Sequence, residues 1–194
     1  MNPVRAIIFA MIIVVVTAAT SDAGWLIYHE PEFKGIILDT DTKQPIEGAV
    51  VVAVYKKASM GLGAGSIDSI INVRETLTDK EGHFRIPSYT TFIQPFSWQI
   101  PTTCIIFKPG YASAEVGNWH FGGEELKEVQ ERGWPWTKEL KYKLRGRGIV
   151  ELPKVKTREE RWNASFVGVT GYSEKELPML YKARSEEDKA SSVK

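Results

Sequence analysis

The chain has 194 residues, of which 43% are hydrophobic and 25% are charged, and its formal net charge is +1. This composition is that of a globular protein with a real core, and it argues against wholesale disorder. The small net charge excludes a dedicated nucleic-acid binder, because such proteins carry a strong basic excess. The length fits one domain with additions or two small domains.

The N-terminus has the pattern of a secretory signal peptide. Arg5 precedes an almost unbroken apolar run, Ala6–Ala19, and small residues stand before a cleavage point after Ala23. Cleavage after Ala19 is an alternative. A retained membrane anchor is the other interpretation, although a helix of this length spans only about 21 Å of a hydrocarbon core about 30 Å thick. We expect residues 1–23 to be removed and the protein to be periplasmic or extracellular.

Cys104 is the only cysteine, so the chain has no internal disulfide and no multi-cysteine zinc site. Its stability must therefore come from its core. The apolar run Cys104–Phe107 predicts a strand that holds a buried, inert thiol, with an intermolecular bridge as the alternative.

The strand Ala49–Tyr55 is the centre of the predicted fold. All seven of its residues are apolar or aromatic, and the run is too short for a typical helix. Asp39–Pro45 and Thr78–Gly82 carry turn chemistry, and Asp39 with Asp41 fits a solvated turn better than a calcium site. Further strands are predicted at Phe33–Leu38, Ile70–Thr78, His83–Ile86, Cys104–Phe107 and Lys138–Leu144.

Three segments do not fit simple strands. Lys56–Ile71 contains alternate glycines without the spacing of a nucleotide-binding motif, which predicts an inserted loop. Ser88–Thr103 is rich in aromatic residues and proline, which indicates a long loop or an edge strand. Trp25–Glu32 has no clear periodicity and is interpreted as an entry segment, and Glu124–Glu131 predicts a short helix.

The motifs of this region resemble those of one family. They are Gly35–Asp39, Pro45–Ala53, the turn and strand Thr78–Pro87, and Lys108–Tyr111. Together they resemble the carboxypeptidase regulatory-like domain family over about residues 34–114. The resemblance implies a mainly β fold, an antiparallel transthyretin-like β-sandwich, and a binding, scaffolding or stabilising module without an active site.

The C-terminal region predicts two helices. Thr157 with Glu160, and Ser173 with Glu176, have the spacing of capping boxes. Leu177, Leu180 and Tyr181 lie on one stripe of the second helix, Ser173 to about Lys189. Both faces of Ala49–Tyr55 are apolar, so the outer face needs a cover. We therefore expect the sandwich to occupy residues 24–156, with the helical tail 157–194 packed on it.

Candidate binding residues are aromatic. The residues are Trp98, Trp119, His120, Trp134 and Trp136. Exposed tryptophans could stack on sugar rings or on a protein partner, although insertions with their own cores would also use them. His120 beside Glu124 is the basis of a third reading, a hydrolase site. None of the three histidines has a partner at metal or catalytic spacing.

The sequence therefore predicts a non-catalytic module with a structural or protein-binding role in the envelope or outside the cell. A carbohydrate-binding module and a hydrolase are the alternatives. We expect no cofactor or metal. The basic segment Lys138–Lys156 has seven Lys and Arg against Glu139 and Glu151. It either contacts an anionic partner, such as a membrane surface or an acidic polysaccharide, or pairs with the acidic half of the chain. The oligomeric state is not predicted.

Overall fold

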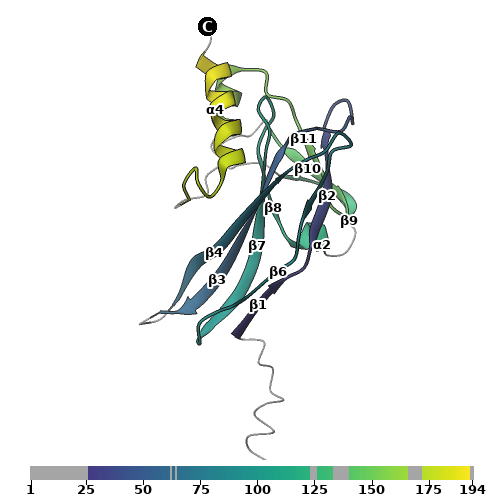
Figure 1. Ribbon diagram of the computed structural model, residues 1–194. Coiled ribbons are helices and arrows are strands. Elements are labelled where there is room, and N and C mark those ends of the chain that lie inside the picture. The colour runs from purple at the N-terminus through teal and green to yellow at the C-terminus, as the bar shows by residue number, and fades with distance from the viewer. Residues whose placement is uncertain are drawn as a thin grey trace, which may run out of the picture.

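A computed structural model describes residues 26–61, 63, 65–122, 126–132, 140–165 and 172–192. The described chain is mainly β, with strands stacked as a sandwich and helices at the C-terminal end, which confirms the predicted fold class (Figure 1). The predicted signal peptide, residues 1–23, lies outside the described residues. No helix among the described residues has the length and apolar character needed to cross a membrane.

The strands form three sheets. A five-stranded sheet has the order β5-β2-β11-β10-β9 and a four-stranded sheet has the order β4-β3-β7-β8, while β1 and β6 pair as a two-stranded ribbon. All described pairs are antiparallel except β11 with β2. The strands are β1 (Ile27–Glu30), β2 (Phe33–Asp39), β3 (Val50–Met60), β4 (Ser66–Leu77), β5 (His83–Ile86), β6 (Tyr89–Phe92), β7 (Ser97–Phe107), β8 (Ala114–Gly117), β9 (Leu126–Arg132), β10 (Tyr142–Gly146) and β11 (Ile149–Leu152).

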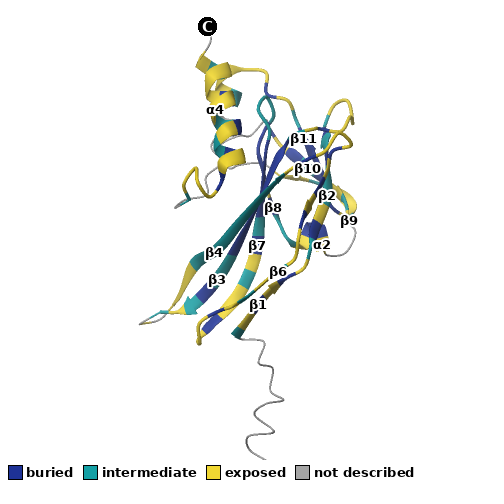
Figure 2. Ribbon diagram, in the orientation of Figure 1, coloured by how far each residue is buried: buried dark blue, intermediate teal, exposed yellow. Residues whose placement is uncertain are grey.

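The main core lies between the two larger sheets. Alternate residues of β3 point into it, and Val51, Ala53 and Tyr55 are each fully buried. They pack with side chains of the facing sheet such as Leu144 and Leu152. Figure 2 shows the upper part of β3 as buried and the lower ends of the strands as increasingly exposed. The period-2 alternation of a strand thus accounts for one apolar face of the central run.

A second cluster covers the other face of β3. Val50, Val52 and Val54 point away from the main core and pack with Leu177 and Leu180 of the tail. The tail helices are α3 (Arg158–Ser165) and α4 (Pro178–Ser192), and a short helix, α2 (Trp119–Gly122), follows β8. The cover that the apolar outer face requires is therefore supplied by Leu177 and α4, as the sequence predicts.

Two buried or half-buried carboxylates fasten α4 to the sandwich. Glu75 in β4 accepts hydrogen bonds from the backbone N–H groups of Met179 (2.7 Å) and Leu180 (3.0 Å), and so caps the first turn of the helix. Glu187 accepts one from the N–H of Gly110 (2.6 Å) and one from Arg161 of α3. Polar groups of three other segments, β4, the turn at Gly110 and α3, therefore set the position of α4.

The first predicted capping box forms in full, whereas only the Glu176 half of the second one forms, and the second one does not begin the helix. Glu160 accepts from the N–H of Thr157 at 2.9 Å, and Glu176 accepts from the N–H of Ser173 at 2.9 Å. The prediction that the second helix starts at Ser173 is wrong, because α4 starts at Pro178. Proline has no N–H to donate and favours the first position of a helix, which accounts for the later start.

Two segments that do not fit simple strands in the sequence form strands: the predicted inserted loop Lys56–Ile71, and Ser88–Thr103, for which a long loop or an edge strand is predicted. Lys56–Ile71 extends β3 and β4 into a long hairpin, and the glycines lie at its tip, where the described residues include Gly61 but not 62 or 64. Ser88–Thr103 contains β6 and most of β7. Pro101 is tolerated in β7 because it lies where the pairing with β3 shifts register, between Thr103 and Ile100.

Other predicted elements also differ from the structure. Leu126–Arg132 is strand β9 and not part of a helix, because pairing with β10 outweighs the helix propensity of its Lys, Glu and Arg residues. The entry segment includes β1. The closing strand is Tyr142–Gly146, and it turns back at Gly148 into β11, which the sequence reading missed.

Candidate functional site

His120 is a buried structural residue. It is 0% exposed, and its Nε2 lies 3.1 Å from the carbonyl oxygen of Ile149 in β11. Burial lowers the pKa of His120, and the positive charge of Arg132 lowers it further. The contact with the Ile149 carbonyl acts in the opposite direction but does not outweigh burial. The neutral imidazole therefore donates from Nε2 and ties α2 to β11. Glu124, the expected carboxylate partner, lies outside the described residues.

Trp119 and Trp98 lie in different surroundings. The indole of Trp119 packs against the backbone of Gly117, where an added Cβ would come within 2.4 Å of Nε1, and the Arg132 guanidinium lies 5.2 Å from its ring centre. Trp98 stands opposite Ala58 near the start of β7. It is four residues before Thr102, which contacts Asn118, so about 13 Å of strand separates the two regions.

The structure therefore does not bring Trp98 and Trp119 together as one stacking platform. Trp134 and Trp136 lie outside the described residues, so their part in a binding surface stays a prediction. Trp119 is 38% exposed and Trp98 is 44% exposed. Of the predicted binding residues that the structure describes, Trp98 is the more exposed.

A buried carboxylate that the sequence reading missed anchors the β1–β6 ribbon. Glu30 is 1% exposed, and its Oε1 accepts hydrogen bonds from Thr102 (2.6 Å) and from Gln99 (2.8 Å). Asn118 donates to Oε2 at 3.2 Å. A buried carboxylate needs hydrogen-bond donors to replace the water that it loses, and here neutral side chains supply them. Glu30 thereby fixes β1 against β7. The sequence does not show that this side chain is buried, so its role could not be predicted from the sequence.

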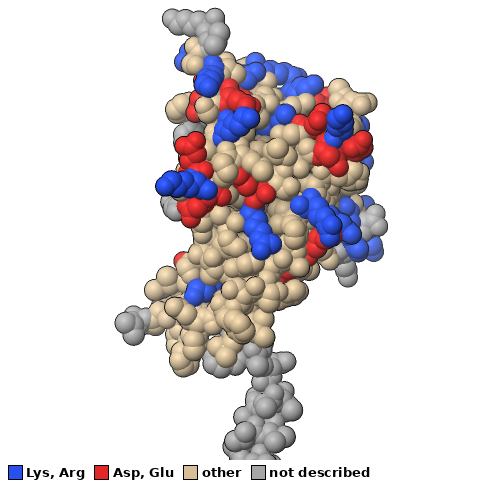
Figure 3. All heavy atoms as spheres, in the orientation of Figure 1, with Lys and Arg blue, Asp and Glu red and all other residues tan. Residues whose placement is uncertain are grey.

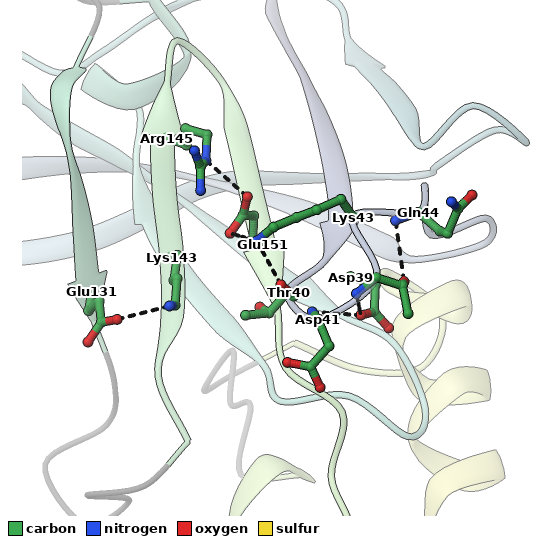
Figure 4. Close-up of polar contacts among 10 residues, drawn as sticks. Asp39, Thr40, Asp41, Lys43, Gln44, Glu131, Lys143, Arg145 and Glu151 are labelled. Carbon is green, nitrogen blue, oxygen red and sulfur yellow. Dashed lines mark hydrogen bonds and ion pairs between the residues drawn. The ribbon is translucent and has the colours of Figure 1, made fainter.

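Of the seven basic side chains of Lys138–Lys156, three in the described part of the chain form ion pairs with carboxylates of the same chain. Figure 4 shows those of Lys143 and Arg145. Arg145 and Lys43 both bind the buried Glu151, at 3.0 and 2.8 Å. Lys143 pairs with Glu131. These contacts are those expected if the segment pairs with acidic residues of the same chain.

Asp39 is a buried turn carboxylate. Its Oδ1 accepts from the N–H groups of Asp41 and Thr42 (each 2.9 Å), and Lys154 lies 3.2 Å from its Oδ2. Burial alone would raise the pKa of Asp39, but the hydrogen bonds from Thr42, Lys154 and Asp41 outweigh it and lower the pKa to about 2. The turn is a capped turn, and within the described ranges no group of three His, Cys, Asp or Glu could hold a metal ion.

Six of the eleven large apolar side chains that the described residues expose lie where two hairpins turn, while others, such as Trp162 on α3 (65% exposed), lie elsewhere. We call the surface at these turns the apolar end. The β3–β4 hairpin supplies two of its residues, the β6–β7 connection supplies three, and the start of β1 supplies one. They are Phe92 (84% exposed), Phe96 (71%), Met60 (69%), Ile67 (64%), Trp98 (44%) and Ile27 (44%).

Main-chain contacts join these side chains into one surface. The N–H of Met60 donates to the carbonyl oxygen of Phe96 at 3.0 Å, Trp98 stands opposite Ala58, and Ile27 pairs with Phe92. Figure 3 shows the lower part of the molecule as almost free of charged side chains, in contrast with the upper part. The exposed apolar area is on the order of several hundred Å², the size that marks an interaction site on a soluble domain.

Phe96 is held in a strained conformation. Its φ is +62°, in the left-handed region that bulky residues rarely adopt. It is the third residue of the turn Gln94–Ser97, which is closed by the bond from the Ser97 N–H to the Gln94 carbonyl oxygen. A glycine or asparagine would fit this position without strain. The fold thus keeps a phenylalanine, mostly in solvent, at a position where the backbone disfavours it.

Comparisons with known proteins do not assign a family. No protein-family model matches the chain, and no curated protein matches it. Among solved structures, the crystal structure of 3-chlorocatechol 1,2-dioxygenase from Rhodococcus opacus 1CP shows a partial likeness, with 14% identity and a TM-score of 0.33 over 70% of this chain and 62% of that chain. The chain therefore matches less than two thirds of the length of that enzyme, and nothing about activity follows from so low a score.

Proposed function

We propose that this protein is an exported, non-catalytic β-sandwich that binds a component of the cell envelope through its apolar end. The observation that carries the proposal is the apolar end itself, where the two most exposed aromatic side chains of the described chain, Phe92 and Phe96, lie. Exposed apolar surface of this size costs solubility and is retained where it makes a contact. The resemblance to carboxypeptidase regulatory-like domains supports a binding role, because that family implies a module without an active site.

Four buried titratable groups of the described chain make contacts that hold the fold together. His120 is buried and bonds to Ile149, and Glu30, Glu151 and Glu187 each hold elements together. A catalytic acid or base must reach the proton that it transfers in a bound substrate. These contacts favour a structural use of the four groups, and they support a non-catalytic role.

Retention in the cell tests the proposal. The full chain and a variant with Phe92→Ser and Phe96→Gly are produced in the source cells, and envelope and soluble fractions are compared. The wild-type protein should be exported and recovered with the envelope, whereas the variant should be exported but released into the soluble fraction. Cytoplasmic retention of the wild-type protein would contradict export, and equal envelope retention of the variant would contradict binding through the apolar end.

A further inference from the structure

The chain enters the described structure at the apolar end. The carbonyl oxygen of Leu26 accepts a hydrogen bond of 2.9 Å from the N–H of Ile93, and the next residue, Ile27, pairs with Phe92. The apolar run Ala6–Ala19 is thus joined to this end through seven residues, which reach about 25 Å at most. If this segment is retained as a membrane anchor, which is the alternative to cleavage, it brings the apolar end towards that membrane's surface.

The segments that build the apolar end contain no charged residue over long stretches. Ser88–Phe107 and Ala58–Ile67 lack Asp, Glu, Lys, Arg and His altogether, although a quarter of the whole chain is charged. Lys57, whose Nζ contacts Gln94 at 3.2 Å, and Asp68, opposite Ala58, mark the boundary. The polar side chains within the two uncharged segments carry hydroxyl and amide groups.

This chemistry suits a lipid interface better than a protein partner. Aromatic residues concentrate at the level of the lipid headgroups, where an apolar ring meets polar, hydrogen-bonding surroundings. Protein interfaces usually surround an apolar centre with a polar rim and are enriched in arginine. The two uncharged segments supply Ser, Thr and Gln as the polar neighbours of the exposed rings in the sequence, and Lys57 reaches their boundary at Gln94.

We propose that the apolar end is the surface with which the folded protein rests on a lipid bilayer, with Met60, Phe92 and Phe96 in the headgroup region. This inference rests on the proposed function, since it names the partner of the same surface. A few exposed side chains give weak, reversible binding on their own, and a nearby membrane-bound segment would raise their effective concentration at the surface.

The proposal differs in its salt dependence from contact through Lys138–Lys156. A basic surface binds anionic lipid, and salt screens that attraction. The apolar end should bind zwitterionic lipid and keep its contact when the salt concentration rises. The salt dependence of lipid binding therefore distinguishes contact through the apolar end from contact through Lys138–Lys156 without any mutation.

The test uses the full chain in phosphatidylcholine vesicles, so that it does not depend on a separately folded part. A fluorophore attached at Ser66→Cys reports contact with nitroxide-labelled lipids. It should be quenched, and equally so at about 0.05 and 0.5 M NaCl. Changing Met60→Ser, Phe92→Ser and Phe96→Gly together should lower the fraction in contact about tenfold or more, because apolar surface no longer leaves water. Val129→Ser with Met179→Ser, also exposed apolar residues, should leave quenching unchanged.

The opposite results overturn the inference. An unquenched probe, equal quenching in the triple variant, or loss of quenching in salt would each show that the apolar end does not contact lipid. Sedimentation of the same samples shows whether the protein binds a second copy of itself. If the wild-type chain self-associates through the apolar end and the probe is unquenched, the partner of this end is another molecule of the same protein. Envelope retention that needs Phe92 and Phe96, together with failure in pure lipid, would leave the proposed function standing and exclude the bilayer as its partner.

Discussion

The backbone N–H of Met60 donates a hydrogen bond of 3.0 Å to the carbonyl oxygen of Phe96. This bond joins the tip of the β3–β4 hairpin to the turn before β7, and it makes one surface from two parts of the chain. Both side chains remain mostly in solvent. The backbone hydrogen bond therefore holds the two segments together, while the side chains of Met60 and Phe96 contribute little to the core and stay available for binding.

Replacement of Phe96 by glycine should not weaken the fold. The left-handed conformation costs a bulky residue roughly 1–2 kcal/mol, while the extra freedom of glycine in the unfolded chain costs roughly 0.5–1 kcal/mol. F96G should therefore unfold at the same or a slightly higher urea concentration than the wild-type protein. Phe84→Ala, which empties a core position, serves as the control and should lose about 3–5 kcal/mol. A loss of more than about 1 kcal/mol in F96G would mean that Phe96 stabilises the fold.

Glu187 and Glu186 form a matched pair on α4. Glu187 is buried and holds the Gly110 N–H and Arg161, whereas Glu186 is exposed. Glu187→Ala should lower the free energy of unfolding by about 1–3 kcal/mol, since it leaves a backbone donor and a cation without their partner. Glu186→Ala should change it by less than about 0.5 kcal/mol. Equal effects in urea denaturation would contradict the anchoring role of Glu187.

Removal of Thr157–Lys194 should expose the outer face of β3. Val50, Val52 and Val54 would lose their contacts with Leu177 and Leu180 and form an exposed apolar patch. We expect the truncated chain to aggregate, as measured by light scattering during refolding. A soluble truncation that unfolds cooperatively would show that α4 is dispensable as a cover.

The turn at Asp39 should make stability depend on acid. The folded pKa of about 2 lies below the ordinary value of 3.8, so the stabilisation is present above about pH 4 and is lost as the pH falls towards 2. Asp39→Asn should lose on the order of 2 kcal/mol at pH 7, and its difference from the wild-type protein should shrink on acidification. The exposed Asp41→Asn is the control. A pH-independent difference for Asp39→Asn would refute the assignment.

Cys104 should not react in the folded protein. It is fully buried, and burial raises the pKa of its thiol, so thiolate is scarce at neutral pH. Iodoacetamide should modify it only in denaturant, at a rate that follows unfolding, as mass spectrometry can measure. Rapid modification under native conditions would indicate an opening near β7 that the packing does not predict.

The sequence predicts the centre of this fold well because burial and strand period act together there. The all-apolar run Ala49–Tyr55 indicates both a strand and a covered outer face, and the spacing of Leu177 and Leu180 indicates what covers it. Turn chemistry at Thr78–Gly82 also agrees with the structure, where the Gly82 φ of +74° and the close Ile37 carbonyl exclude a side chain. Local signals and tertiary contacts favour the same conformation at these positions.

The apolar end could not be predicted in the same way. Its segments contain glycine, proline and exposed aromatic residues, which indicate loops, and only pairing between distant strands makes them hairpins. Trp98 was a candidate from sequence, whereas Met60, Ile67, Phe92 and Phe96 were not. The absence of charge from Ser88 to Phe107 is a visible signal that could have indicated this surface.

The most direct measurement compares two ends of one molecule on a membrane. Ser66 and Ser185 are both exposed, the first beside the apolar end and the second on α4, and each can carry one fluorophore through a Ser→Cys change while the buried Cys104 stays unmodified. In the full chain on phosphatidylcholine vesicles, nitroxide lipids should quench the probe at position 66 and leave the probe at position 185 bright. Equal quenching at both positions, or none at position 66, would contradict the account.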